Sequence, residues 1–487
     1  MRFHPMATSR AGTRAIRRGS RGLTIRLAPH SPKQHNLYSA VDHGQPVTLD
    51  PGSFAPQQRG GGWGAFAEPF LRMNEPALAA IDVRAEFAAG ADGTVVRLHA
   101  GGRAGAIPLR SAQTGQISAG FVVKPRFGWA GVGRVLSETG WHAAPEFLDL
   151  PLVPGSGREV PPWVLAGPIL VRLSALLGAL RPGYRETEAV LRHPRGRIVW
   201  SRYRAESLAT GRWDRLVCRF PELSSDPRLR RIVRWALERI HQDLVAAGGQ
   251  DPVAMSLATI AVRLIGQLSD APPLSPRRDE LRSLTLTLHA DRILRSGIEA
   301  IAWIVEERGL GGGRELDGLA WQLPLDRLWE FYVEAVIRKE ASLVGGDVKV
   351  GRLGETVFPL QWTDPSHRSL GHLVPDIVVR RGRSLRVVDA KYKAHLAEID
   401  VRGWHHFTDD AREAHRADIH QVLAYAALFD AEDVTATLVY PLRQATWNAL
   451  QARRRDISRA SLLHGGRRVA IELRGLPFGG VREACDA

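Results

Sequence analysis

The stretch VPDIVVRRGRSLRVVDAKYK, residues 374–393, decides the fold of the C-terminal part of the chain. Two mainly apolar runs, Ile377 to Val379 and Leu385 to Val388, flank a polar turn that contains Gly382. This pattern predicts a β-hairpin. Charged side chains border both runs, where a buried strand would carry hydrocarbon. Such local violations of a folding pattern tend to mark functional sites, so we expect one end of this hairpin to carry the chemistry.

Alternation along a strand places the charged residues of the hairpin on one face. Residues two apart point the same way, so Asp389 and Lys391 project together while the small Ala390 turns to the other side. Asp376 opens the first strand directly after Pro375 and can approach this pair across the hairpin. The sequence therefore predicts two carboxylates and one lysine at the same end of the hairpin.

Two carboxylates beside a lysine form a site for a hard divalent cation such as Mg²⁺, which takes oxygen ligands and keeps several waters. The main-chain carbonyl of Ala390 would add another oxygen. Lys391 would orient or help deprotonate a water near the metal and offset charge on a phosphoryl group, as metal-assisted phosphodiester hydrolysis requires. The alternative is a solvated sheet edge, because charges commonly protect edge strands, and the Asp-x-Lys pattern alone favours that alternative.

The hairpin and three further blocks, in this order along the chain, resemble a known family. The PD and DAK of residues 375–376 and 389–391 resemble the PD-(D/E)xK nuclease signature, with Asp in the variable acidic place. Residues 418–426 (DIHQVLAYA) resemble the helix that follows the nuclease hairpin in McrC-type restriction subunits, and residues 438–441 (LVYP) resemble their next strand. Residues 328–333 (LWEFYV) resemble the helix that carries the first acidic residue of the fold.

The resemblance implies a restriction-endonuclease-like fold, in which a mixed central sheet carries helices on both sides. It implies that Asp376 and Asp389, with help from Glu330, hold a Mg²⁺ ion, for which Mn²⁺ can substitute. Lys391 would prepare the attacking water and stabilise the transition state.

Two more residues of the downstream helix belong to the implied site. Gln421 would assist catalysis by positioning a phosphate or the lysine, and Tyr425, its i+4 neighbour, would support it or simply pack. Glu334 lies one turn after Glu330 on the same helix face and competes for its role. The resemblance, and not the periodicity, favours Glu330.

Composition bounds the class of protein. The 487 residues are 44% hydrophobic and 24% charged, which is ordinary for a soluble protein of about two to four domains. The net charge of +15 points to a polyanionic partner, although arginine is abundant throughout. Cys218 and Cys485 lie far apart, which argues against a disulfide framework or zinc finger. Arg172 interrupts the most apolar run, Trp163 to Leu180, so we expect a soluble, cytoplasmic protein without a membrane segment.

We expect a multidomain α/β protein with four segments. Residues 1–37 hold eight basic and no acidic residues, which predicts a disordered basic extension. Residues 38–160 predict a β-rich N-terminal domain that binds a partner, because Arg126 to Glu138 resembles the part of McrC-like proteins that reaches a ring-forming GTPase. Residues 161–313 predict a mainly helical middle region, and residues 314–487 the nuclease domain.

Periodicity and turn signals predict the elements of these segments. Residues 37–153 are predicted to be mostly strands and loops, and the glycine-rich run 128–133 to be a turn and not a dinucleotide loop. Strands are predicted at residues 81–87, 94–100, 117–125 and 469–473, and helices at 161–180, 253–268, 278–307 and from Pro227 behind the cap Asp226. The helix from Pro227 carries a predicted core stripe, which is Leu229, Ile232, Val233, Ala236, Leu237, Ile240 and Leu244.

Three polar regions leave alternatives open. In the middle region, arginines interleave with Trp200 and Trp213; they grip a phosphate backbone, or the tryptophans are core and the arginines solvated or paired. Residues 394–417 are histidine-rich and predict a mobile loop over the site in preference to a zinc site. Basic clusters at 453–455 and 467–468 contact DNA or are solvated. The arginines in question are Arg195, Arg197, Arg212 and Arg219, and the loop holds His395, His405, His406, His415, Asp409 and Asp410.

The expected function is that of a Mg²⁺-dependent DNA endonuclease subunit in a McrBC-like modification-dependent restriction system, a defence against foreign DNA. The resemblance implies an AAA+ GTPase partner that recognises or translocates methylated DNA. The chain has no Gly-x-x-x-x-Gly-Lys-Ser/Thr loop, so we expect it to bind no nucleotide itself. The alternatives are a nuclease of another defence or repair system, and a non-cleaving subunit that activates a motor NTPase.

Overall fold

The computed structural model describes residues 36–479, with gaps at 55–62, 91–92, 142, 157–158, 181–182, 225–226, 249–250, 288–291, 306–316, 365–368, 394–407, 432 and 465–466. The predicted basic extension therefore lies outside the described residues, except for Asn36 and Leu37, which begin the first strand. The predicted cap Asp226 also falls in a gap.

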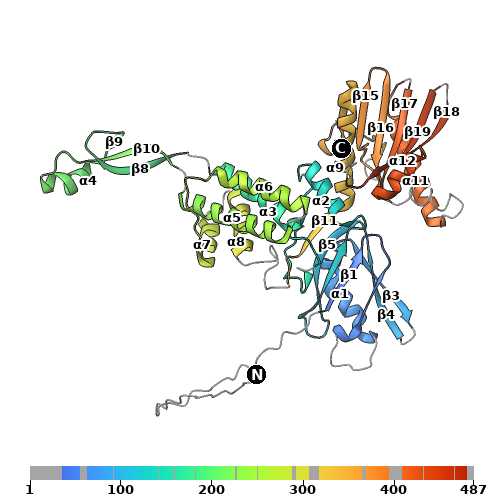
Figure 1. Cartoon of the computed structure of the whole chain (residues 1–487), viewed down its shortest axis with the longest axis horizontal. Coiled ribbons are helices and arrows are strands. Elements are labelled where there is room, and N and C mark those ends of the chain that lie inside the picture. Colours follow the sequence, from blue (N-terminus) through green and yellow to red (C-terminus); the bar gives the residue numbers. More distant parts are fainter. Residues whose placement is uncertain are drawn as a thin grey trace, which may run out of the picture. The chain divides into compact units, whose positions relative to one another are not determined.

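The C-terminal part of the chain forms a six-stranded mixed sheet (Figure 1). Its order is β12 (Asp347–Val350), β15 (Ile377–Arg381), β16 (Ser384–Ala390), β17 (Asp433–Leu442), β19 (Arg467–Pro477) and β18 (Ile457–His464). The predicted hairpin is β15 and β16, which pair antiparallel around Gly382 at a φ of 55°. β16, β17 and β19 run parallel to one another, while β12 and β18 pair antiparallel at the two edges.

Helices cover both faces of this sheet. α9 (Leu325–Val344) packs on the side that carries Ile377 and Val388. α11 (Asp409–Ala427) and α12 (Gln444–Ala452) pack on the side that carries Leu385 and Val387. Alternation along β16 separates the two sets of side chains. The expected mixed central sheet with helices on both sides is confirmed.

The N-terminal part is built on two sheets, as its alternating runs predict. One has the order β1 (Asn36–Val41), β6 (Ile117–Lys124), β5 (Arg103–Arg110), β11 (Trp321–Pro324) and β7 (Glu146–Phe147). The other has the order β2 (Val47–Leu49), β4 (Gly93–Ala100) and β3 (Val83–Gly90). β11 comes from the segment predicted as nuclease domain, yet Trp321 pairs opposite Ala106 of β5. Residues 321–324 follow the predicted boundary at residue 314 but belong to the N-terminal five-stranded sheet and not to the C-terminal sheet.

Two helices lie where strands, loops or a turn are predicted. α1 (Ala67–Ala80) contains Pro76 and is tied to the sheet by buried Asn74, whose Nδ2 donates to the carbonyl of Arg110 at 3.0 Å. The turn predicted at residues 128–133 is wrong, because these residues begin α2 (Gly128–Glu138). An added Cβ at Gly133 would lie 2.6 Å from Cγ2 of Val253, so the glycine serves close packing of α2 and not a bend.

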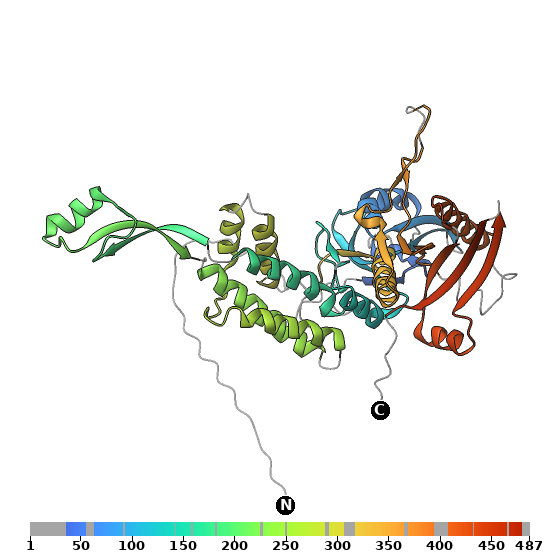
Figure 2. The ribbon, with the colours of Figure 1, turned by 90° about the horizontal axis from the view of Figure 1, so that it is seen from above.

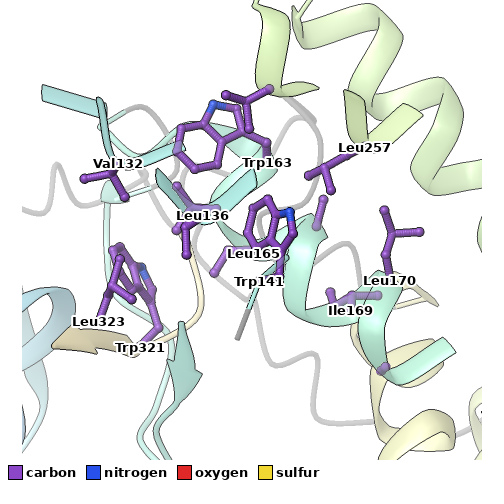
Figure 3. Packing of buried hydrophobic residues seen from close by; sticks show 14 of the residues in the cluster. Val132, Leu136, Trp141, Trp163, Leu165, Ile169, Leu170, Leu257, Trp321 and Leu323 are labelled. Carbon is purple, nitrogen blue, oxygen red and sulfur yellow. The ribbon is translucent and has the colours of Figure 1, made fainter. Parts of the chain in front are cut away.

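The middle region is a set of packed helices, as predicted. They are α3 (Pro162–Ala179), α5 (Pro227–Gly248), α6 (Pro252–Gly266), α7 (Arg278–Thr287) and α8 (Arg292–Val305), so the helix predicted at 278–307 is two helices. All seven residues of the predicted stripe on α5 are buried. Figure 3 shows how Trp163, Ile169 and Leu170 of α3 pack with Leu136 and Leu257. Within the described part of the chain, α3 alone is long and apolar enough to cross a membrane, but 61% of it is buried in this core.

A three-stranded arm interrupts the helices. β8 (Gly183–Leu191), β10 (Leu216–Ser224) and β9 (Arg197–Ile198) form a long twisted ribbon with α4 (Trp200–Arg202) at its end (Figure 2). Trp200 and Trp213 are 61% and 73% exposed, so the interpretation of these tryptophans as core is wrong. Arg219 pairs with Glu188 and Arg195 stacks on Phe220, while Arg197 and Arg212 are exposed. Phosphate binding by this arm stays a prediction.

Candidate active site

The end of the hairpin brings Asp389 and Lys391 together, as alternation predicts. Asp389 is the penultimate residue of β16 and is only 1% exposed. Lys391 directly follows the strand, and its amide donates to the carbonyl of Val439 at 2.9 Å. Its Nζ lies 2.6 Å from Oδ2 of Asp389, although the geometry of this charge contact does not make a hydrogen bond. The lysine and carboxylate therefore form a close ion pair at the end of a buried strand.

Asp376 meets the same strand from the other half of the hairpin. Its Oδ2 accepts a hydrogen bond of 2.8 Å from the amide of Ala390, the residue between the ion-paired groups. Two contacts fix the chain at this point: the Asp376 carbonyl accepts from Gly351 at 2.8 Å, and the Pro375 carbonyl accepts from the hydroxyl of Thr356 at 2.6 Å. Asp376 is therefore held beside Asp389 by main-chain geometry on both sides.

The helix α11 supplies the other contacts of the lysine. Lys391 Nζ donates to Oε1 of Gln421 at 2.9 Å, and Gln421 Nε2 donates to the hydroxyl of Tyr425 at 2.8 Å. Tyr425 is buried against the sheet. The three side chains form one chain of hydrogen bonds, in which the amide of Gln421 holds the lysine and the phenol holds the amide.

Glu330 and Glu334 on α9 have different surroundings. Glu334 is buried and accepts hydrogen bonds from Arg338 at 2.8 Å and from Arg352 at 2.5 Å. Burial works to raise the pKa of this carboxyl, but Arg352 and Arg338 lower it overall. These two arginines neutralise Glu334, so it is a poor candidate for the site. Glu330 is exposed, and the charges of Asp389 and Lys391 are close enough to change its pKa. Glu330 therefore lies at the edge of the cluster.

The carboxylates of the cluster repel one another. Burial, followed by the charges of Asp389 and Glu330, raises the pKa of Asp376 well above its ordinary value. Burial also raises the pKa of Asp389, even though Lys391 opposes this. Partial desolvation by the surrounding protein raises the pKa of Glu330, and the negative charges of Asp326 and Asp389 raise it further, to about 7. Solvent screens part of this effect because the side chain is exposed. Groups with such strongly shifted pKa values are common at functional sites.

The residues present fit a Mg²⁺ ion that keeps much of its water. Asp376 and Asp389 offer hard oxygen donors, and the buried Oδ2 of Asp389 has no hydrogen-bond partner. Among the described residues, no three acidic, histidine or cysteine side chains are close enough together to form a ready-made metal site. Two carboxylates with water in the remaining positions agree with both observations, and Glu330 would then act through water.

Sequence reasoning gave no role to Asp418, the first residue of the block it quoted on α11. Lys393 Nζ donates to both oxygens of this buried carboxylate, at 2.7 and 2.9 Å. The spacing Asp418 to Gln421 is the signal that points to it, because one helical turn places both side chains toward residues 391–393. The pair fixes the chain directly after β16.

The polar insertion predicted at residues 394–417 is partly helix. α11 begins at Asp409, and His415 is buried, with Nδ1 3.2 Å from the Tyr440 hydroxyl. His395, His405 and His406 lie outside the described residues, so the zinc alternative for this segment is not tested by them.

Fold and site together define a multidomain α/β protein with an acid and lysine cluster at the end of a central hairpin. The sequence matches the family model of the McrBC 5-methylcytosine restriction system component over residues 172–441, more than half of the chain. The chain therefore belongs to this family, and the resemblance to McrC-type subunits is confirmed.

Two solved structures are similar to the chain at low sequence identity. The refined half-complex from a tetradecameric assembly of Thermococcus gammatolerans McrB AAA+ hexamers with bound McrC is 13% identical, with 92% of this chain and 97% of that chain covered and a TM-score of 0.40. The cryo-EM structure of the Thermococcus gammatolerans McrBC complex is 12% identical, with 62% and 88% covered and a TM-score of 0.26. No curated protein matches the sequence.

Proposed function

We propose that this chain is the DNA-cleaving subunit of a modification-dependent restriction system and that its C-terminal sheet is a nuclease of the PD-(D/E)xK type. The observation that carries the proposal is the placement of Asp376, Asp389 and Lys391 at one end of the hairpin, with Gln421 holding the lysine. Membership of the restriction family supports the same conclusion.

The chemistry assigns a task to each residue. Asp376 and Asp389 would hold a Mg²⁺ ion, and such an ion would supply Lewis-acid polarisation of the phosphodiester and a water of lowered pKa. Lys391 points its ammonium group at this region and stabilises negative charge that builds up on the phosphoryl oxygens. Gln421 keeps the ammonium group in place, and Glu330, at the edge of the cluster, would accept a proton or help Asp376 and Asp389 to hold the metal. Mn²⁺, which prefers the same oxygen donors, is expected to substitute.

We further propose that the chain works with an AAA+ GTPase on modified DNA, in the cytoplasm. One of the solved structures named above is of McrB AAA+ hexamers with bound McrC, and the other is of a McrBC complex. The sequence has no Gly-x-x-x-x-Gly-Lys-Ser/Thr loop, and in this proposal the AAA+ GTPase supplies any nucleotide-driven movement. The net charge of +15 favours binding to the DNA backbone, and this binding should weaken as salt is added.

The test is cleavage of methylated and unmethylated plasmid by the purified chain, with and without the AAA+ partner, GTP and Mg²⁺. Wild type is expected to cut the methylated plasmid only when all are present, and Asp389→Ala and Lys391→Ala are expected to abolish cleavage while they leave folding and partner binding intact. Cutting by either variant at the wild-type rate would refute the assignment. Absence of cleavage with stimulated GTP hydrolysis would show an activating subunit, and cleavage without the partner a free-standing nuclease.

A further inference from the structure

The residue after the catalytic lysine is held by the N-terminal part of the chain. Tyr392 is 6% exposed, and alternation turns it to the side of the strand opposite Lys391. Its hydroxyl donates to Oδ2 of Asp42 at 3.1 Å, directly after β1. Its ring packs against Phe127 and Phe478, with centroids 5.9 Å away in both cases. Tyr392 thus links the end of β16 to residues more than 250 positions earlier.

Arg126 makes the most direct contacts with this residue. Its Nη2 donates to the main-chain carbonyl of Tyr392 at 3.1 Å, and its Cζ lies 4.4 Å from the centre of the tyrosine ring. The carbonyl oxygen of Arg126 accepts from Arg443, which immediately follows β17, at 3.3 Å. One arginine therefore touches the chain at the ends of the two central strands of the sheet, β16 and β17.

Asp42 fixes Arg126 in turn. The amide of Arg126 donates to Oδ1 of Asp42, and its Nε lies 3.4 Å from Oδ2. The side chain of Asp42 is fully buried and that of Arg126 is 15% exposed, so both charges are largely out of water. Burying an ion pair is costly, and hydrophobic residues of similar volume often stabilise a fold as well or better. The pair is therefore better explained by the geometry it enforces than by stability alone.

We propose that Arg126 is a positioning residue for Lys391. On one side of the lysine, the amide of Lys391 bonds to Val439 of β17; on the other, the carbonyl of Tyr392 bonds to Arg126. Displacement of Arg126 releases that carbonyl, which belongs to the peptide after Tyr392, and so loosens the residue that directly follows Lys391. Arg126 follows β6 and precedes α2, so a movement of this N-terminal segment reaches Tyr392, the neighbour of Lys391, through the side chain of Arg126.

This inference rests on the proposed nuclease function, but its first test does not need cleavage. The sequence holds six lysines, at positions 33, 124, 339, 349, 391 and 393. Reductive ¹³C-methylation of the full chain gives few lysine signals, and the signal of Lys391 is assigned by its loss in Lys391→Arg. Arg126→Lys keeps a charge opposite Asp42 but loses the planar fork that reaches both the carbonyl and the ring. It is expected to shift or broaden the Lys391 signal.

A matched variant separates positioning from general loss of an arginine. Arg172 in α3 is also partly buried and lies 4.6 Å from the ring centre of Trp303, in the helical middle region. Arg172→Lys removes a similar cation–π contact, and we expect it to leave the Lys391 signal and cleavage unchanged. Tyr392→Phe removes only the hydroxyl contact with Asp42, keeps the ring and the carbonyl, and is expected to retain most of the activity.

Cleavage by the complex with its partner provides the second measurement. Arg126→Lys is expected to lower kcat by about tenfold or more, as small misplacements of catalytic groups do, while KM for DNA stays unchanged. An unmoved Lys391 signal, unchanged cleavage, or an equal loss in Arg172→Lys would overturn the inference. If instead Asp389→Ala cleaves normally, the proposed nuclease function fails, whereas the Lys391 signal still decides whether Arg126 positions the lysine.

Discussion

Lys391 and Gln421 are joined by a hydrogen bond of 2.9 Å between Nζ and Oε1. This bond connects the end of β16 to α11, which begins only at Asp409. The lysine has a long side chain with several rotatable bonds, and one ion pair to Asp389 leaves its direction free. The amide of Gln421, held by Tyr425, removes part of that freedom. The direction of the Lys391 side chain therefore depends on a contact with α11 as well as on its contact with β16.

Gln421→Leu is expected to lower the rate of DNA cleavage without loss of DNA binding. The variant keeps the volume of the side chain but removes the acceptor, so Lys391 samples other directions; we expect kcat to fall by about tenfold to a hundredfold. Gln444→Leu is the matched control, because Gln444 also donates to a residue four positions later, Asn448, but on α12 and away from the lysine. Equal rates for Gln421→Leu and Gln444→Leu would show that Gln421 does not position the lysine.

Asp376→Asn is expected to stabilise the fold in the absence of metal while it abolishes cleavage. Burial and neighbouring carboxylates raise the pKa of Asp376, so its ionised form destabilises the folded state at neutral pH. The asparagine oxygen still accepts from the amide of Ala390. In EDTA at pH 7.5, the thermal midpoint should rise relative to wild type, and Asp347→Asn, on the exposed end of β12, should leave it unchanged.

Addition of Mg²⁺ should raise the thermal midpoint of wild type more than that of Asp376→Asn. A ligand that binds only the folded state stabilises it by ~2.7 kcal/mol at a hundred times its Kd, and the variant lacks one of the two proposed ligands. Wild type should therefore gain more from Mg²⁺ than Asp376→Asn. A lower midpoint for the variant in EDTA, or an equal gain with Mg²⁺, would argue against carboxylate crowding at a metal site.

The elements that could be predicted from the sequence are those formed by interactions between residues close together in the chain. The hairpin could be predicted because its pattern is local, and the same alternation places Asp389 beside Lys391. The helices α9 and α11 are expected only from the resemblance of residues 328–333 and 418–426, and the start of α11 at Asp409 is not predicted. β11 could not, because the sheet that Trp321 joins is decided by pairing with a strand about two hundred residues earlier. The contact of Lys391 with Gln421 is expected from the resemblance, although no spacing in the sequence predicts it. The contact of Arg126 with Tyr392 joins residues far apart in the chain, and no pattern in the sequence predicts it.

His415 is expected to make the stability of the C-terminal sheet depend on pH. Burial lowers the pKa of His415 from its ordinary value of 6.5, so the folded state favours the neutral imidazole. This contribution to stability is fully present above pH 6.5 and is lost as the pH falls from there toward the folded pKa. The thermal midpoint of His415→Gln should therefore fall less between pH 7.5 and 5.5 than that of wild type. His420→Gln, which changes an exposed residue of the same helix, should follow the wild-type curve.

Gly133→Ala is expected to destabilise the protein, because α2 packs too closely for a methyl group at this position. The added Cβ would lie 2.6 Å from Cγ2 of Val253 and 2.9 Å from the ring of Trp163, both buried in the core. Overpacking of this kind costs about 1–3 kcal/mol. Gly178→Ala is the matched control, since Gly178 also lies in a helix but an added Cβ there meets nothing within 4 Å. In an open helical position alanine is favoured over glycine by roughly 0.5–1 kcal/mol, so the two substitutions should shift the urea midpoint in opposite directions. A shift in the same direction for both would mean that α2 does not pack on α3 and α6 as described.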